Sequence, residues 1–156
     1  MLNKIQAADS MLVEAIKEFR NDDSQISYIK SILLSGAVIG ITNPLLIEKG
    51  LETSIGEVAN LSVSLSHNQF NSHKEKETYK RRTISFLKYV YNALKHSGVP
   101  KDSIQPSDDL EIECDLKTEA RDLIMHAKTD MEKLNLSHDD LSEDLLSYFL
   151  ELDFEP

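Results

Sequence analysis

One stretch of the chain, Ser31–Ile47, carries no charged side chain, although 28% of the 156 residues are charged. Lys30 and Glu48 bound this stretch. It is either the central helix of a soluble bundle or a marginal membrane span, because about 20 apolar residues are needed to cross a bilayer. Its shortness favours a buried helix, and we expect no membrane span.

The dipeptide Asn43-Pro44 lies inside this stretch. Asparagine is a good helix cap, and proline lacks the N–H that a helix interior uses but is tolerated at the first helical position. The pair therefore predicts that a central helix over residues 26–41 ends there, and that a short second helix runs to Gly50. Gly36 and Gly40 are four residues apart, which predicts the close approach of another helix.

Apolar residues recur at helical spacing through most of the remaining chain, which indicates an all-α fold. We expect a multi-helix bundle of about five to seven helices around the central apolar helix, in a single domain over residues 1–156. Residues 101–109 read as a loop and 110–114 as a connector. The other expected helices are one from Ile5 to Asn21, one opened by Ser54, a long one through Tyr79–Leu94, one over Thr118–Leu134, and a last one that is capped by Ser137 and reaches Leu152.

Cysteine usage and motif content narrow the functional classes. The single Cys114 excludes an internal disulfide framework and is typical of a reducing compartment, and the first residues lack a signal-peptide type of apolar run. We therefore expect a cytoplasmic protein. No metal-binding histidine or cysteine pair, phosphate-binding glycine loop or serine-hydrolase elbow is present, so we expect no metal and no cofactor.

Charge is distributed unevenly along the chain. Residues 1–100 hold 12 Lys or Arg against 10 Asp or Glu, whereas residues 101–156 hold 5 against 17. The net charges of these two parts are therefore +2 and −12. Asymmetry of this kind indicates interaction surfaces.

The acidic C-terminal part predicts the main functional surface. It could dock a basic protein, cover the basic site of a toxin or enzyme, or mimic nucleic acid; solubility alone would also explain it. We expect a non-enzymatic interaction protein, either a subunit of a complex or an inhibitor or immunity-type protein, and homo-oligomers remain open. The expected partner-binding residues are Asp108, Asp109, Glu111, Glu113, Asp139, Asp140, Glu143 and Asp144.

A basic segment, residues 74–95, precedes the acidic part. Its cations are interleaved with aromatic residues, as in proteins that stack on unpaired bases. The candidate contacts to nucleic acid are Lys80, Arg81, Arg82 and Lys88. However, helical spacing places Tyr79 and Phe86 on the inward face, and the acidic part would repel phosphate. We expect these cations to pair mainly with the acidic C-terminal part.

The spacing of Arg121 and His126, with the polar Asp122 after the arginine, resembles the motif of the HEPN family. Members of that family are small helical bundles, often ribonucleases of toxin–antitoxin and antiviral systems. The resemblance implies that Arg121 would hold the phosphate and that His126 would act as the acid or base, across a dimer. This is the enzymatic alternative to an interaction protein.

Overall fold

The structure, a computed structural model, describes residues 3–66, 69–96 and 110–156. These residues contain seven α-helices and one short 3-10 turn, and they form no β-strand, which confirms the all-α prediction. The elements are α1 (Lys4–Asn21), α2 (Gln25–Glu48), α3 (Ser54–Leu65), α4 (His73–Leu87), α5 (Tyr89–Lys95), α6 (Leu116–Lys133), η3 (His138–Asp140) and α7 (Glu143–Leu150).

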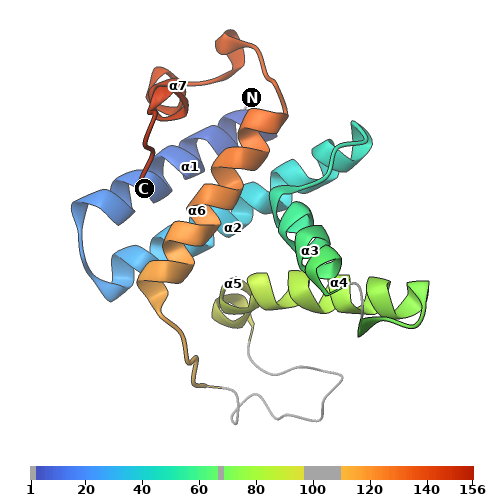
Figure 1. Cartoon of the computed structure of the whole chain (residues 1–156). Coiled ribbons are helices and arrows are strands. Elements are labelled where there is room, and N and C mark those ends of the chain that lie inside the picture. Colours follow the sequence, from blue (N-terminus) through green and yellow to red (C-terminus); the bar gives the residue numbers. More distant parts are fainter. Residues whose placement is uncertain (1–2, 67–68, 97–109) are drawn as a thin grey trace.

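Helix α2 is the centre of the bundle. It packs along its length against α1 on one side and α6 on another, and Figure 1 shows α6 crossing in front of it. Ser31 draws α1 close, because its hydroxyl donates to the carbonyl of Ala15 at 3.0 Å. Helices α3 and α4 form a hairpin, defined here as residues 54–87, which projects from this body, while α7 covers the far side of α1 (Figure 1).

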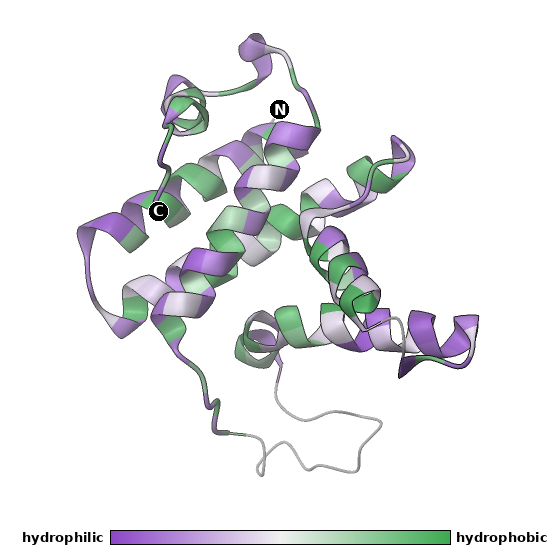
Figure 2. Cartoon of the chain, in the orientation of Figure 1, coloured by the Kyte–Doolittle hydropathy of each residue, from purple (hydrophilic) through white to green (hydrophobic). Residues whose placement is uncertain are grey.

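This packing buries many of the apolar side chains of α2. Its outline is mostly pale to green in Figure 2, where α1 and α4 carry purple outer faces. Among the described helices, α2 is the one that is long and apolar enough to cross a bilayer, and 44% of its most apolar window is buried inside the protein. The central apolar helix predicted from the sequence is thus present.

The predicted helix break at Asn43-Pro44 is wrong, because α2 continues through Pro44 to Glu48. Pro44 and Gly40 are both exposed, so the Gly40 carbonyl that loses its helical partner can be solvated by water. On the opposite face Leu46 is fully buried and holds the last turn in place. Helix α2 ends at Glu48, and the predicted stop at Gly50 is confirmed. The φ of Gly50 is +70°, and the residue closes a Schellman motif in which the N–H groups of Gly50 and Leu51 donate to the carbonyls of Ile47 and Leu46.

The two glycines of α2 differ. At Gly36 a Cβ atom would collide with the ring of Tyr91 from α5, which confirms a close helix approach. At Gly40 a Cβ atom would meet nothing within 4 Å, so the prediction of close packing there is wrong.

The predicted long helix through residues 79–94 is two helices. The chain turns at Lys88, which ends α4 and begins α5. This turn changes which side chains face inward. Phe86, expected on the inward stripe, is 77% exposed, whereas Val90 is buried.

The last helix also begins later than expected. Residues 138–140 form the turn η3, and α7 is capped by Ser142 rather than by Ser137. The reason is a contact that is distant in sequence: the carboxylate of Asp9 in α1 accepts from both the N–H and the hydroxyl of Ser142, each at 2.6 Å. Leu152, expected inside, lies beyond α7 and is fully exposed.

A pair of matched substitutions tests this packing. We expect Gly36→Ala to lower the free energy of unfolding by about 1–3 kcal/mol, because the new methyl group overpacks against Tyr91. Gly40→Ala should raise it by about 0.5–1 kcal/mol, since alanine favours helices and the site is open. Urea denaturation measures both. Equal effects of the two substitutions would contradict the packing described here.

Candidate functional site

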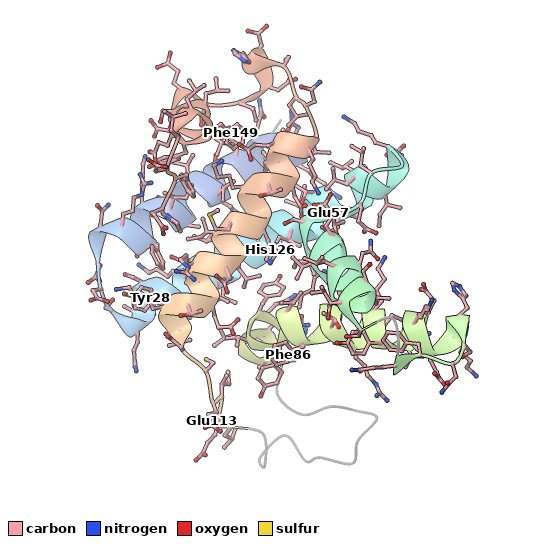
Figure 3. All side chains as sticks on the ribbon, in the orientation of Figure 1. Tyr28, Glu57, Phe86, Glu113, His126 and Phe149 are labelled. Carbon is pink, nitrogen blue, oxygen red and sulfur yellow. The ribbon has the colours of Figure 1, made fainter. Side chains whose placement is uncertain are left out.

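Polar side chains from four elements meet where the α3–α4 hairpin joins the body. We call this cluster the polar junction and define it as Asn43, Ser54, Lys88, His126 and Asp130. Figure 3 shows one member, His126, between α6 and α3. The cluster brings the buried Asp130 together with two half-buried titratable side chains, Lys88 and His126, as a site for chemistry would.

Asp130 is the centre of the junction and is fully buried. Its Oδ1 accepts from the backbone N–H of Ser54, in the first turn of α3, at 2.7 Å. With its amide oriented by its hydrogen-bond neighbours, Asn43 donates to Asp130 Oδ2 at 3.2 Å and accepts from Lys88 Nζ at 3.2 Å. Burial raises the pKa of Asp130, while the hydrogen bond from the Ser54 N–H and the positive charges of Lys133 and Lys88 act to lower it.

The same burial acts on the other two titratable groups. Burial lowers the pKa of Lys88, and Asp130 opposes this change. Burial also lowers the pKa of His126, which favours the neutral imidazole at physiological pH. The Nδ1 atom of His126 and the hydroxyl of Ser54 are 2.7 Å apart and share a hydrogen bond.

A serine that is hydrogen-bonded to a histidine forms two members of a catalytic triad, but within the described part of the chain no carboxylate orients this histidine. Asp130 bonds the Ser54 backbone instead of orienting the imidazole. Ser54 is only 8% exposed, and it lines none of the grooves that run along α4, between α1 and α2, and beside Pro44. The geometry of the polar junction therefore suits a structural role, in which it connects helices, better than a catalytic one. Among the described residues, no group of three or more histidine, cysteine or carboxylate side chains could hold a metal ion.

The structure does not bring Arg121 and His126 together within one chain. Five residues apart on α6, they project about 140° from each other around the helix. His126 faces α3, whereas Arg121 is exposed and lies 3.4 Å from the carboxylate of its neighbour Asp122.

The predicted acidic residues fall at two opposite ends of α6 (Figures 1 and 3). Glu111 and Glu113 are exposed in the extended segment before α6. A second exposed group follows α6, and the 18 residues of the helix separate the two groups by about 27 Å. Asp108 and Asp109 lie outside the described residues. The second group comprises Asp139, Asp140, Glu143 and Asp144.

The predicted basic residues also separate. Lys80 forms an ion pair with Glu52 at 3.0 Å, and Lys88 turns into the polar junction. Arg81 and Arg82 remain exposed on the outer face of α4. The expected pairing of this segment with the acidic C-terminal part is wrong for Lys80, which pairs with Glu52, and for Arg81 and Arg82, since α4 and α7 lie on opposite sides of the molecule (Figure 1). Lys88 interacts with Asp130 only through the electrostatic effect of the two charges, without an ion pair among the described residues.

Comparison of the chain with protein-family models, with curated proteins and with solved structures finds no match. Function must therefore be inferred from the described surfaces themselves.

The half-buried imidazole of His126 leads to a prediction about pH. Because the pKa of His126 lies below its ordinary value of 6.5, the unfolded chain binds a proton first as the pH falls. The free energy of unfolding should therefore decrease below about pH 6.5, by at most about 1.4 kcal/mol per pH unit from this group. In His126→Asn, whose amide can keep the bond to Ser54, this contribution should be absent.

Urea denaturation at pH 5, 6 and 7 measures the effect, and His138→Asn is the matched control because His138 is exposed. Asp130 titrates in all three proteins, so the difference between them isolates the histidine. An unchanged pH dependence in His126→Asn would show that the imidazole is not held neutral by burial.

Proposed function

We propose that this chain is a non-enzymatic cytoplasmic interaction protein whose acidic end binds a basic protein partner. The acidic end is defined as residues 138–156, which include η3, α7 and the C-terminal segment. It holds seven carboxylate side chains and no Lys or Arg. This concentration of negative charge on one side of the molecule is the observation that carries the proposal.

Most of these carboxylates are available to a partner. Asp144 pairs with Lys17, and Glu151 pairs with Arg20, both at 2.7 Å. Within the described residues, Asp139 and Glu143 form no ion pair, and Asp140 accepts a hydrogen bond from the hydroxyl of Ser137. Exposed charge that the chain does not neutralise supports electrostatic attraction of a cationic surface.

The acidic end is fixed in place by α1. Arg20 binds Glu151 through two nitrogen atoms and also donates to the carbonyl of Glu155, at 2.6 Å for its closer nitrogen. The same guanidinium lies over the rings of Tyr148 and Phe154. A surface that is already ordered loses less conformational entropy when a partner binds.

Two leucines add an apolar component to this surface. Leu150 is 81% exposed at the end of α7, and Leu152 is fully exposed two residues later. Exposed apolar side chains beside charged ones support a protein partner over a simple cation.

The ribonuclease alternative has weaker support from the geometry. One of its two residues, His126, is engaged with Ser54, and the other, Arg121, lies on the opposite flank of the same helix. Acidic neighbours, including Asp122, would also repel an RNA phosphate.

Charge reversal tests the proposal. We expect the triple variant Asp139→Lys, Asp140→Lys, Glu143→Lys to reduce partner binding at least tenfold, because it replaces three attractive charges by repulsive ones. Asp144 is left intact because its ion pair with Lys17 helps hold α7. The measurement is quantitative pull-down with mass spectrometry, followed by titration with the purified basic partner at two salt concentrations.

The double variant Glu111→Lys, Glu113→Lys is the matched control, since these carboxylates are exposed at the other end of α6. It should retain the partner. Identical capture by all three proteins, with no effect of salt, would exclude docking through the acidic end.

A further inference from the structure

The outer face of α4 is a surface that the acidic-end proposal does not use. No residue of α4 is fully buried, although the helix has 15 residues. A groove of about 460 Å³ runs along its first turns, and a second groove continues from it; Thr78 and Arg82 line both. These two adjoining grooves on the outer face are called the channel here.

Cations line this channel. Lys74 and Arg82 border the first groove, and Arg81 and Arg82 border the second. Within the described residues these three side chains form no ion pair, and Arg81 contacts only the backbone carbonyl of Glu77, at 3.4 Å. Helix α4 as a whole holds five cations against two carboxylates, a net charge of +3. Glu75, which also lines the first groove, is held by the backbone N–H of Asn71 at 2.7 Å.

Aromatic rings accompany the cations. Phe70 and Tyr79 line the first groove and contact each other, with ring centroids 5.1 Å apart. Phe86 lines neither groove, but it follows Arg82 by one helical turn and is 77% exposed. An exposed ring beside an unpaired cation matches what an unpaired base and its phosphate require, namely a stacking surface and a positive charge.

The spacing along α4 favours a polymer over a single anion. Lys74 and Arg82 are eight residues apart, which is about 12 Å along the helix axis, and Phe86 lies a further turn away. A single phosphate could not contact this whole row. The acidic end lies on the opposite side of the molecule (Figure 1), and at physiological ionic strength charges are screened beyond about 8 Å.

We propose that the channel along the outer face of α4 binds single-stranded nucleic acid. Lys74, Arg81 and Arg82 contact phosphates in the channel, and Phe86, one turn beyond Arg82 and outside both grooves, stacks on a base. The site is independent of the acidic end, so the protein has two separate binding surfaces. Lys80 and Lys88, which the sequence also suggested, take no part because they are engaged by Glu52 and by the polar junction.

Fluorescence anisotropy with labelled 15-mers of uridylate and thymidylate tests the proposal on the full chain. Three phosphate contacts predict that affinity falls about 20-fold between 50 and 200 mM salt. The double variant Arg81→Glu, Arg82→Glu should lose at least tenfold in affinity for both oligomers. Phe86→Ala should lose about fivefold or more, through loss of base stacking. A preference for one oligomer would assign RNA or DNA as the ligand.

Lys76→Glu is the matched control, because Lys76 is exposed on the same helix and lines neither groove. It should bind within about twofold of the natural chain. All variants are first checked for unchanged thermal melting, which we expect because the substituted side chains are exposed.

Two results would overturn the proposal. The first is no binding of either oligomer at 50 mM salt, including the case in which Arg81→Glu, Arg82→Glu instead abolishes a dimer seen by light scattering. The second is equal competition by inorganic polyphosphate together with no effect of Phe86→Ala, which would show a general polyanion surface without base contacts.

Discussion

The buried carboxylate of Asp130 is the interaction on which the placement of the α3–α4 hairpin depends. A charge without partners in a protein interior costs several kcal/mol, so it is found only where hydrogen bonds and opposite charges surround it. Here the backbone N–H of Ser54 and the amide of Asn43 donate hydrogen bonds to it, and the positive charge of Lys88, which is bonded to Asn43, acts on it electrostatically. These groups belong to α3, to α2 and to the turn between α4 and α5, so one side chain of α6 interacts with three elements at the base of the hairpin.

This connection positions the basic surface on α4, and separate contacts position the acidic end. Helix α4 projects from one side of the body with its cations outward, while α1 holds the acidic end on the other side through Asp9, Lys17 and Arg20. The charge asymmetry along the sequence thus becomes a separation in space, and among the described residues two ion pairs, Lys17–Asp144 and Arg20–Glu151, join the acidic end to α1. This separation would let the two proposed surfaces bind different ligands at the same time.

Much of the fold could be predicted from the sequence, because local patterns determine it. The uncharged stretch identified the central helix, and Gly36 identified its closest contact. The errors arise where the tertiary packing of a residue, and not its local sequence, determines the backbone conformation. Pro44 stays in α2 because it faces solvent, and Phe86 is exposed because Lys88 turns the chain into the junction. The polar junction could not be predicted, because its members are far apart in sequence. The one signal in the sequence was the carboxylate of Asp130 at the edge of the apolar stripe of its helix.

Native-state hydrogen exchange of an Asp130→Ala variant tests the central role of this carboxylate most directly. We expect faster exchange of backbone amides in α3, α4 and α5, while amides of α1, α2 and the middle of α6 retain their protection, since the apolar packing of those helices is untouched. Unchanged protection in the hairpin, or an equal loss of protection throughout the chain, would contradict the claim that Asp130 holds the hairpin to the body.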